Sequence, residues 1–368
     1  MRVINIVTQM EAGGAQGAAI RMAMELRSRG HTVETWFLYQ KRPTYIGLEG
    51  VKVVYNQTPK SRADYLTICL RLIVLLKQYK PDCVITYTHY ANIVGQIIAT
   101  ILRIPIRIAT QRSLLDLYPR FAKIADKFIG CIGCYTHNIA VSSAVYDCFS
   151  NYPNRYKNKL EVVNNGIEIS RLLISKEISR ERYDLPKDMP LIINVGRLSK
   201  AKNQLFLIRL LPYLQGVNLA IAGDGELREV LLDEANRLGV SERLFILGEI
   251  KPEEVRCFLC SGDLFIFPSL SEAFGFALVE AMSVGLPIIT SDIPAFKDIL
   301  KIDDGEEAGI LISLSDKNRF ITSIKEVLKN EDISGSLASK AIKKARHFSI
   351  EKMVDSYEKC FYKSKKHN

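Results

Sequence analysis

The chain has 368 residues, 48% hydrophobic and 24% charged, which is the composition of a globular protein with room for two or three domains. No apolar run reaches the roughly 18 residues that a spanning helix requires, and a predicted strand at residues 3–7 begins almost at the N-terminus, so we expect neither a transmembrane segment nor a secretory signal. The net charge of +10 is concentrated in residues 1–166, which carry 21 Lys/Arg against 10 Asp/Glu, so the first half is expected to face something anionic.

The first half alternates predicted strands and helices. A strand at 3–7, a loop at 8–17 with Gly13 and Gly14, a helix at 18–29 and a strand at 31–38 form one unit of a parallel sheet with a right-handed crossover. The pattern continues with strands at 51–55, 83–86, 104–110, 138–141 and 161–163 and helices at 63–79 and 91–102. We therefore predict a doubly wound, Rossmann-like domain at residues 1–168.

The second half repeats this organisation after a polar, Pro-interrupted segment at 168–190 that is typical of a linker. Predicted strands follow at 191–195, 219–222, 244–247, 263–267, 288–291 and 308–311, with helices at 205–214, 226–238, 252–260, 317–329 and 336–347, the last two separated by Gly335. The sequence thus predicts an α/β protein with a second Rossmann-like domain at 169–349 and a final amphipathic segment at 350–368. In such folds ligands bind at the carboxyl ends of the strands, so we expect the site in a cleft between the two domains.

The most informative stretch is Pro268–Ser283, which follows a buried strand. It places Glu272 in a polar loop and Glu280 in the first turns of a helix, with Phe274-Gly275-Phe276 between them. The helix N-terminus offers amide donors to an anion, Gly275 allows close approach to the backbone, and each carboxylate can accept hydrogen bonds from two adjacent hydroxyls. This pattern indicates a site for a polyol that carries a phosphate.

Two further loops follow strands of the same domain. Gly196-Arg197 and Lys202 come after the strand at 191–195, where an Arg and a Lys can neutralise a leaving diphosphate; the alternative is two solvated surface cations. Gly223-Asp224-Gly225 follows the strand at 219–222 and is as compatible with a tight turn as with a ligand loop. It lacks the third Gly and the later acidic residue of a dinucleotide-binding fingerprint.

The eight cysteines include two CxxC pairs, Cys131/Cys134 and Cys257/Cys260. The first has His137 nearby but no fourth ligand, and the second lies in a predicted amphipathic helix without a nearby His. We interpret these cysteines as buried thiols of a reducing cytosol rather than as a zinc site.

These residues together resemble the retaining GT-B glycosyltransferases of the group 1 type, glycosyltransferase family 4. The resemblance is specific over residues 185–312 and looser in the first domain, where it rests on the Gly13-Gly14 loop, on 140–142 and on a domain-junction motif at 163–168. It implies a GT-B fold in which the domain at 1–168 binds the acceptor, the domain at 169–349 binds the nucleotide-sugar donor, and the C-terminal helix crosses back to the first domain. It also implies a nucleotide-sugar donor, UDP- or GDP-linked, and no metal cofactor, and the sequence has no suitably placed DxD motif.

Carried over to this sequence, the resemblance gives each motif a role. Glu272 would contact the donor sugar, Glu280 the ribose hydroxyls, and Arg197 and Lys202 the diphosphate. The remaining donor-binding candidates implied in this way are Gly13, Gly14, Gly196, Gly223, Gly225, Leu247, Gly248, Phe274, Gly275, Phe276 and Ala277.

One departure from the family concerns the catalytic base. Many relatives place a His where this chain has Arg112, which can clamp a phosphate or an acceptor but cannot act as a base at neutral pH. His89, at the end of the preceding strand, is the nearest alternative; a structural role for it is the other interpretation.

The function that we predict is sugar transfer, with retention of configuration, to a glycan or undecaprenyl-linked acceptor in bacterial surface polysaccharide synthesis of the O-antigen or capsule type. No nucleic-acid motif accompanies the basic first half, so we expect its anionic partner to be either a membrane surface or a phosphorylated acceptor. We expect a cytoplasmic enzyme, with peripheral contact to the anionic inner membrane as the first of these alternatives. Residues 118–135 combine basic and apolar side chains at helical spacing, which indicates either a membrane-surface helix or a helix packed on its own sheet. A nucleotide-sugar epimerase and a non-catalytic sugar-nucleotide-binding subunit are the alternatives.

Overall fold

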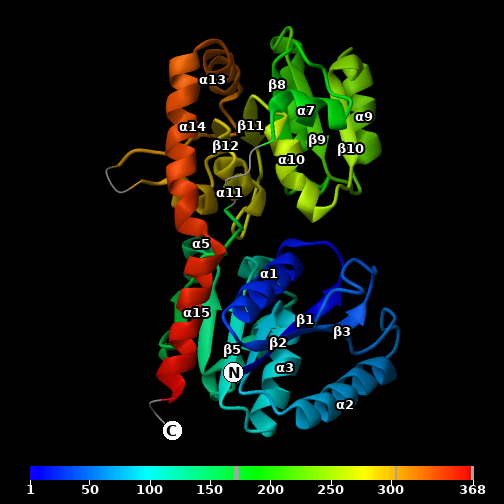
Figure 1. Cartoon of the computed structure of the whole chain (residues 1–368), viewed down its shortest axis with the longest axis vertical. Helices are drawn as coiled ribbons and strands as arrows, with labels where there is room; N and C mark the ends of the chain where they lie inside the picture. The colour runs from blue at the N-terminus through cyan, green and yellow to red at the C-terminus, as the bar shows by residue number, and fades with distance from the viewer. Residues whose placement is uncertain (170–173, 303–304, 366–368) are drawn as a thin grey trace. The chain divides into compact units, whose positions relative to one another are not determined.

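The computed structural model describes residues 1–169, 174–302 and 305–365, and its chain divides into two compact α/β units (Figure 1). Unit 1 comprises Met1–Gly166 with Ser349–Asn368, and unit 2 comprises Ile167–Phe348. Each unit has one parallel sheet with helices on both faces, and the fold is the two-domain GT-B architecture. Residues 366–368 of the predicted C-terminal segment lie outside the described residues.

Unit 1 has a seven-stranded sheet in the order β3-β2-β1-β4-β5-β6-β7. Its elements are β1 (Arg2–Met10), α1 (Gly14–Ser28), β2 (Thr32–Gln40), β3 (Val51–Val53), α2 (Arg62–Tyr79), β4 (Cys83–Tyr87), α3 (His89–Ile101), β5 (Ile106–Gln111), α4 (Arg120–Cys131), β6 (His137–Ala140), α5 (Ser143–Asp147), α6 (Asn154–Lys157), β7 (Leu160–Val162) and α15 (Ile350–Lys365). The central strands are apolar on both sides because helices cover both faces. Helix α1 begins within the predicted 8–17 loop, at Gly14, so that loop is shorter than expected.

Unit 2 has a six-stranded sheet in the order β10-β9-β8-β11-β12-β13. Its elements are α7 (Lys176–Arg182), β8 (Leu191–Val195), α8 (Gln204–Leu210), β9 (Asn218–Ala222), α9 (Arg228–Arg237), β10 (Leu244–Gly248), α10 (Val255–Cys260), β11 (Leu264–Phe267), α11 (Phe276–Ser283), β12 (Ile288–Ser291), α12 (Pro294–Leu300), β13 (Ile310–Ile312), α13 (Lys317–Lys329) and α14 (Glu331–Ala345). The leucines and isoleucines of β8, β9 and β11 pack with α8 and α13 into one core.

Two sequence expectations for unit 2 were wrong. The helix expected to start after Gly335 starts at Glu331, because Asn330 accepts hydrogen bonds from the amides of Asp332 and Ile333 and so caps it. The segment expected to be a linker contains α7, whose Arg180 is 3% exposed, donates to the Ser261 carbonyl at 2.9 Å and pairs with Asp263 at 2.6 Å. Packing on unit 2 therefore orders part of this polar segment.

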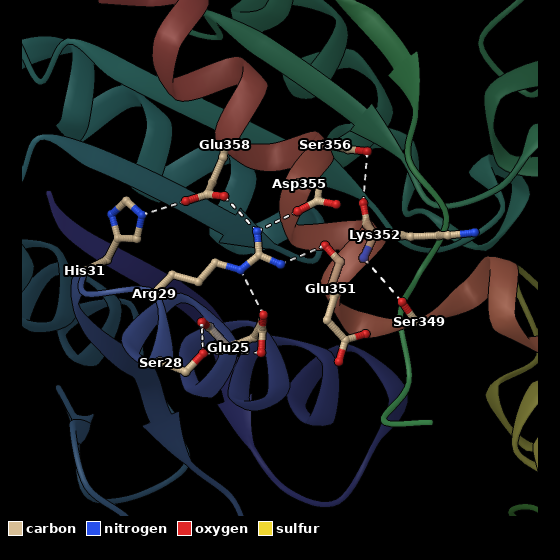
Figure 2. Close-up of polar contacts among 10 residues, drawn as sticks. All are labelled: Glu25, Ser28, Arg29, His31, Ser349, Glu351, Lys352, Asp355, Ser356 and Glu358. Atoms are coloured by element: carbon tan, nitrogen blue, oxygen red, sulfur yellow. Dashed lines mark hydrogen bonds and ion pairs between the residues drawn. The ribbon is translucent and has the colours of Figure 1, made fainter. Parts of the chain in front are cut away.

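Helix α15 is fixed to unit 1 by an ionic cluster around Arg29 (Figure 2). Arg29, at the end of α1, donates to Asp355 at 2.6 Å, to Glu358 at 2.8 Å and to Glu25 at 2.8 Å, and His31 contacts the other oxygen of Glu358 at 2.9 Å. Beneath the cluster, apolar residues of α15 join the core that also contains α1. Although burial opposes it, the hydrogen bonds from His31 and Arg29 hold the pKa of Glu358 below its ordinary value.

We expect Arg29→Ala to lower the free energy of unfolding of unit 1 by about 1–3 kcal/mol at pH 7, because three carboxylates in a partly buried network lose their shared cation. A carboxylate with a lowered pKa stabilises the fold above its unfolded pKa, so this loss should shrink as the pH falls below about 4. Urea unfolding at pH 7 and near pH 3.5 measures both effects. Lys52→Ala, which removes a more exposed pair with Glu34, should cost less than about 0.5 kcal/mol, and equal losses in the two variants would contradict the argument.

Candidate active site

The carboxyl ends of β8 and β11 form the point where the sheet of unit 2 reverses its order. From β8 the chain passes through α8 to β9 on one side, and from β11 it passes through α11 to β12 on the other. The connections from the two strands therefore run in opposite directions along the sheet, and open α/β sheets bind ligands at such points. Here the loops contact each other: the Leu270 amide donates to the Ala201 carbonyl at 2.8 Å, and the Asn203 side chain donates to the Pro268 carbonyl at 3.1 Å.

Lys202 and Glu272 lie on these two loops and form an ion pair. Their side chains are 22% and 12% exposed, so both charges are partly shielded from water. The hydroxyl of Ser269 donates to the Glu272 carboxylate at 3.1 Å, and the Lys202 ammonium lies 4.7 Å from the centre of the Phe267 ring. The structure therefore brings together two predicted site residues that are 70 positions apart in the chain.

Helix α11 begins next to this pair. Gly275, its N-cap, has a left-handed backbone with φ of 105°, and an added Cβ would lie 2.9 Å from the Phe296 ring, so glycine is required on both counts. A glycine cap supplies no side-chain acceptor to the amides of the first turn. Glu280 lies half-buried further along the helix. The rings of Phe274 and Phe276 flank the start of the helix with centres 5.3 Å apart, and Ala277 follows them.

Three glycines hold the ends of β8, β9 and β10 together. Gly223 donates its amide to the Gly248 carbonyl at 2.8 Å, and Gly196 donates to the Ala222 carbonyl at 2.9 Å. A Cβ on Gly223 would lie 2.0 Å from the Gly196 carbonyl oxygen, and one on Gly225 would lie 2.3 Å from the Leu198 oxygen. At the GxG motif, the backbone after β9 therefore lies very close to the backbone after β8, beside the loop that carries Lys202. Leu247 and Gly248 end the neighbouring strand, β10.

Arg197 is placed differently from Lys202. Its side chain is 71% exposed and pairs with Glu226 at 3.2 Å, on the side of the GxG loop. The diphosphate role of Arg197 stays a prediction.

In unit 1 the corresponding reversal of strand order lies between β1 and β4. The hydroxyls of Thr8 and Thr88 are hydrogen-bonded across it, and Thr88 has φ of 77°, an unusual conformation for a β-branched residue. Gly13 and Gly14 form the junction between the β1 loop and α1, where the Gly17 amide donates to the Gly13 carbonyl at 2.9 Å.

His89, the first residue of α3, lies at the same edge. Its ring contacts those of Tyr90 and Tyr118, with centres 4.3 and 4.7 Å away, and among the described residues its buried Nε2 has no hydrogen-bond partner. Burial lowers the pKa of His89, which favours the neutral imidazole at physiological pH. A neutral ring of this kind can accept a proton, and the assignment of His89 as a base stays a prediction.

Arg112 is buried in unit 1, with 9% of its surface exposed. It donates to Thr110 at 3.0 Å and to the Asn165 side chain at 2.6 Å, and its guanidinium lies 4.4 Å from the centre of the Tyr87 ring. These contacts join the residue after β5 to Asn165, near the end of the first segment of unit 1. The acceptor-side role of Arg112 stays a prediction.

A buried polar network beneath α4 was missed in the sequence. Asp126 is fully buried and accepts hydrogen bonds from Tyr135, Tyr156 and Gln111, while Tyr118, whose ring contacts that of His89, donates to Gln111. Burial raises the pKa of Asp126 against the effect of these hydrogen bonds. The four other members of the network are scattered from position 111 to position 156, so no local pattern could have revealed it.

As one of the two interpretations of residues 118–135 expected, helix α4 packs on its own sheet, but it does so through its small buried side and not through Phe121, Ile124 and Phe128.

Two negative findings concern the described residues. No group of three or more His, Cys, Asp or Glu among them is arranged to hold a metal ion, and the cysteines are free thiols. No helix in the described ranges has both the length and the apolar character to cross a bilayer.

Comparisons with known proteins agree with this architecture. Residues 175–348 match the model of glycosyl transferases group 1, and residues 12–171 match that of glycosyltransferase family 4. The lipopolysaccharide core biosynthesis glycosyltransferase LpsE of Rhizobium meliloti is 25% identical over 94% of both chains. The UDP-Gal:alpha-D-GlcNAc-diphosphoundecaprenol alpha-1,3-galactosyltransferase of Escherichia coli is 27% identical over 79% of this chain and 78% of its own. Among solved structures, Anabaena Alr3699/HepE in complex with UDP and glucose has a TM-score of 0.85 at 19% identity, covering 99% of this chain and all of the other.

Proposed function

This chain belongs to the group 1 glycosyltransferases, and we propose that it is a retaining, metal-independent enzyme that transfers a sugar from a nucleoside-diphosphate donor to a glycan or lipid-linked acceptor. The observation that carries the proposal is the Lys202–Glu272 pair beside the glycine cap of α11. The pair lies at the carboxyl ends of β8 and β11, where the strand order of unit 2 reverses. The relatives named for lipopolysaccharide and diphosphoundecaprenol substrates support an acceptor of surface-polysaccharide synthesis. The solved neighbour that holds UDP and glucose supports a UDP-linked donor, with a GDP-linked donor as the alternative.

Each residue has a chemical task in this proposal. Lys202, together with Arg197, neutralises the charge that develops on the leaving diphosphate, which is a task for fixed cations. Glu272 orients the donor sugar through its hydroxyls, and Glu280 accepts hydrogen bonds from the ribose. The leaving phosphate oxygen takes the acceptor proton, so retention does not require a base at Arg112.

The first test is a thermal-shift panel of UDP- and GDP-sugars, since a ligand that binds only the native state raises its melting temperature. The donor so identified is then incubated with acceptor. Release of the nucleoside diphosphate with an unchanged anomeric configuration, read by NMR, is the expected result. An isomerised nucleotide sugar would instead identify an epimerase, and binding without release would identify a non-catalytic subunit.

We expect transfer to continue at its full rate in excess EDTA, because the proposal assigns the leaving-group charge to side chains. The check compares initial rates of chelator-treated enzyme in metal-free buffer with and without added Mg²⁺. Activity that disappears with EDTA and returns with Mg²⁺ would contradict metal independence.

A further inference from the structure

The two cations that the proposed function assigns to the donor diphosphate are both paired with carboxylates. Lys202 pairs with Glu272, and Arg197 pairs with Glu226 at 3.2 Å. Each pair carries no net charge, so a diphosphate that reaches this edge of the sheet meets two neutral pairs and not two free cations. Each carboxylate therefore competes with the diphosphate for the cation that it holds.

The two pairs differ in how strongly water weakens them. The side chains of Arg197 and Glu226 are 71% and 54% exposed, whereas those of Lys202 and Glu272 are 22% and 12% exposed. An exposed ion pair contributes little, but two partly buried charges are screened much less. Separating Lys202 from Glu272 is therefore the step that lowers the affinity for a diphosphate by a measurable amount.

The pair can open through its side chains alone. The loops that carry Lys202 and Glu272 are joined by the backbone hydrogen bond from Leu270 to Ala201, at 2.8 Å. The methylene stem of Lys202 lies against Gly196, directly after β8, where an added Cβ would be 3.4 Å from Cε. Rotation at the end of the lysine side chain therefore moves the ammonium from the carboxylate to a phosphate without moving either loop.

Glu272 has one oxygen available for a second partner. Both contacts of its side chain, with the ammonium of Lys202 and with the hydroxyl of Ser269, are made by Oε1. Among the described residues none is hydrogen-bonded to Oε2, so this oxygen can accept from a sugar hydroxyl. Hydrogen bonds from a sugar thus compensate the carboxylate when Lys202 turns to a diphosphate. A nucleotide without a sugar offers no such compensation.

We propose that Glu272 makes the site discriminate between the nucleotide sugar and the nucleoside diphosphate that remains after transfer. When the donor is bound, Glu272 accepts from the sugar hydroxyls and Lys202 contacts the diphosphate. Once the sugar has passed to the acceptor, Glu272 has lost these hydrogen bonds and pairs with Lys202 again, which weakens the hold on the diphosphate and favours its release. The inference rests on the proposed function, from which it takes the two contacts, and adds the exchange of partners between them.

The test compares affinities of the full chain by isothermal titration calorimetry. The probes are the nucleotide sugar with the largest thermal shift in the panel of UDP- and GDP-sugars, and the corresponding UDP or GDP. We expect Glu272→Gln to bind the nucleoside diphosphate about tenfold more tightly than the wild type does, because the neutral amide leaves Lys202 free for the phosphates. The nucleotide sugar should gain no affinity, since the variant also weakens the hydrogen bonds from its hydroxyls.

Three further variants control for other effects of removing a carboxylate. In a Lys202→Ala background, Glu272→Gln should no longer tighten binding of the nucleoside diphosphate, which separates competition for Lys202 from plain repulsion between Glu272 and the phosphates. Glu226→Gln removes the carboxylate of the exposed pair and should change the affinity by no more than about threefold. Glu272→Ala should show the same gain as Glu272→Gln and takes its place if the Gln variant does not fold.

The possible failures of the two proposals are distinguishable. An unchanged affinity of Glu272→Gln for the nucleoside diphosphate, or a gain that persists without Lys202, would overturn the inference and leave the proposed function standing. An equal gain for the nucleoside diphosphate and for the nucleotide sugar would also overturn the inference, because Glu272 would then not distinguish them. A wild type that binds neither UDP nor GDP, with or without a sugar, would contradict the proposed function itself and the inference with it.

Discussion

Lys202→Ala is expected to lower the turnover number by two orders of magnitude or more while the protein folds normally. The ammonium is held beside Glu272 and over the Phe267 ring, where neighbouring groups partly exclude water. Charge stabilisation in such a setting is worth several kcal/mol in the transition state, and a hundredfold loss corresponds to about 2.7 kcal/mol. The measurement is steady-state turnover with the identified donor and acceptor, alongside thermal unfolding to confirm the fold.

Lys200→Ala is the matched control, because Lys200 is an exposed cation two residues away in the same loop. It should retain nearly the full rate, since a solvated charge contributes little. A Lys202→Ala enzyme with wild-type turnover would remove Lys202 from the reaction.

A double variant distinguishes a direct effect of Lys202 on the diphosphate from a second explanation, in which Lys202 acts only by positioning Glu272. In that case Lys202→Ala/Glu272→Gln should be no slower than Glu272→Gln alone. If Lys202 acts on the leaving diphosphate itself, the two losses should be close to multiplicative. We expect the second result.

The site at the carboxyl ends of β8 and β11 could be predicted from the sequence because the residues that indicate it lie in short, continuous stretches of the chain. Buried apolar runs identify the strands, and the polar residues after each run must lie at the carboxyl edge of a parallel sheet. That reasoning, together with the family resemblance, anticipated Lys202 and Glu272 in one site. It could not anticipate the partner of Arg197, because the direction of a long exposed side chain depends on neighbours such as Glu226 that are distant in sequence.

The errors in the fold have a comparable origin. Gly335 was interpreted as a helix breaker, but an added Cβ there would meet nothing within 4 Å, so the position tolerates glycine without requiring it. The start of α14 is set instead by the Asn330 cap. The Asp126 network was invisible for a different reason: a buried carboxylate depends on tertiary partners, and composition alone places Asp on the surface.

Gly223→Ala is expected to destabilise unit 2 by about 3 kcal/mol or more and to weaken donor binding at least tenfold. The added Cβ would lie 2.0 Å from the Gly196 carbonyl oxygen, and the backbone has φ of 150°, which L residues rarely adopt. Relief requires the ends of β8 and β9 to separate, which strains the hydrogen bonds from Gly196 to Ala222 and from Gly223 to Gly248. The Lys202 loop leaves from the same point, so its position changes too.

Gly335→Ala is the control that separates this steric argument from a general effect of replacing glycine. At that open helical position, alanine should stabilise the protein by about 0.4–1 kcal/mol, because it reduces the entropy of the unfolded chain. Urea unfolding gives the two stability changes, and the thermal shift produced by UDP compares donor binding by the folded variants. An unchanged UDP response in a destabilised Gly223→Ala protein would show that the glycine serves only the packing of β8 against β9. A lost response in the folded variant would show that the close backbone approach itself forms part of the donor site.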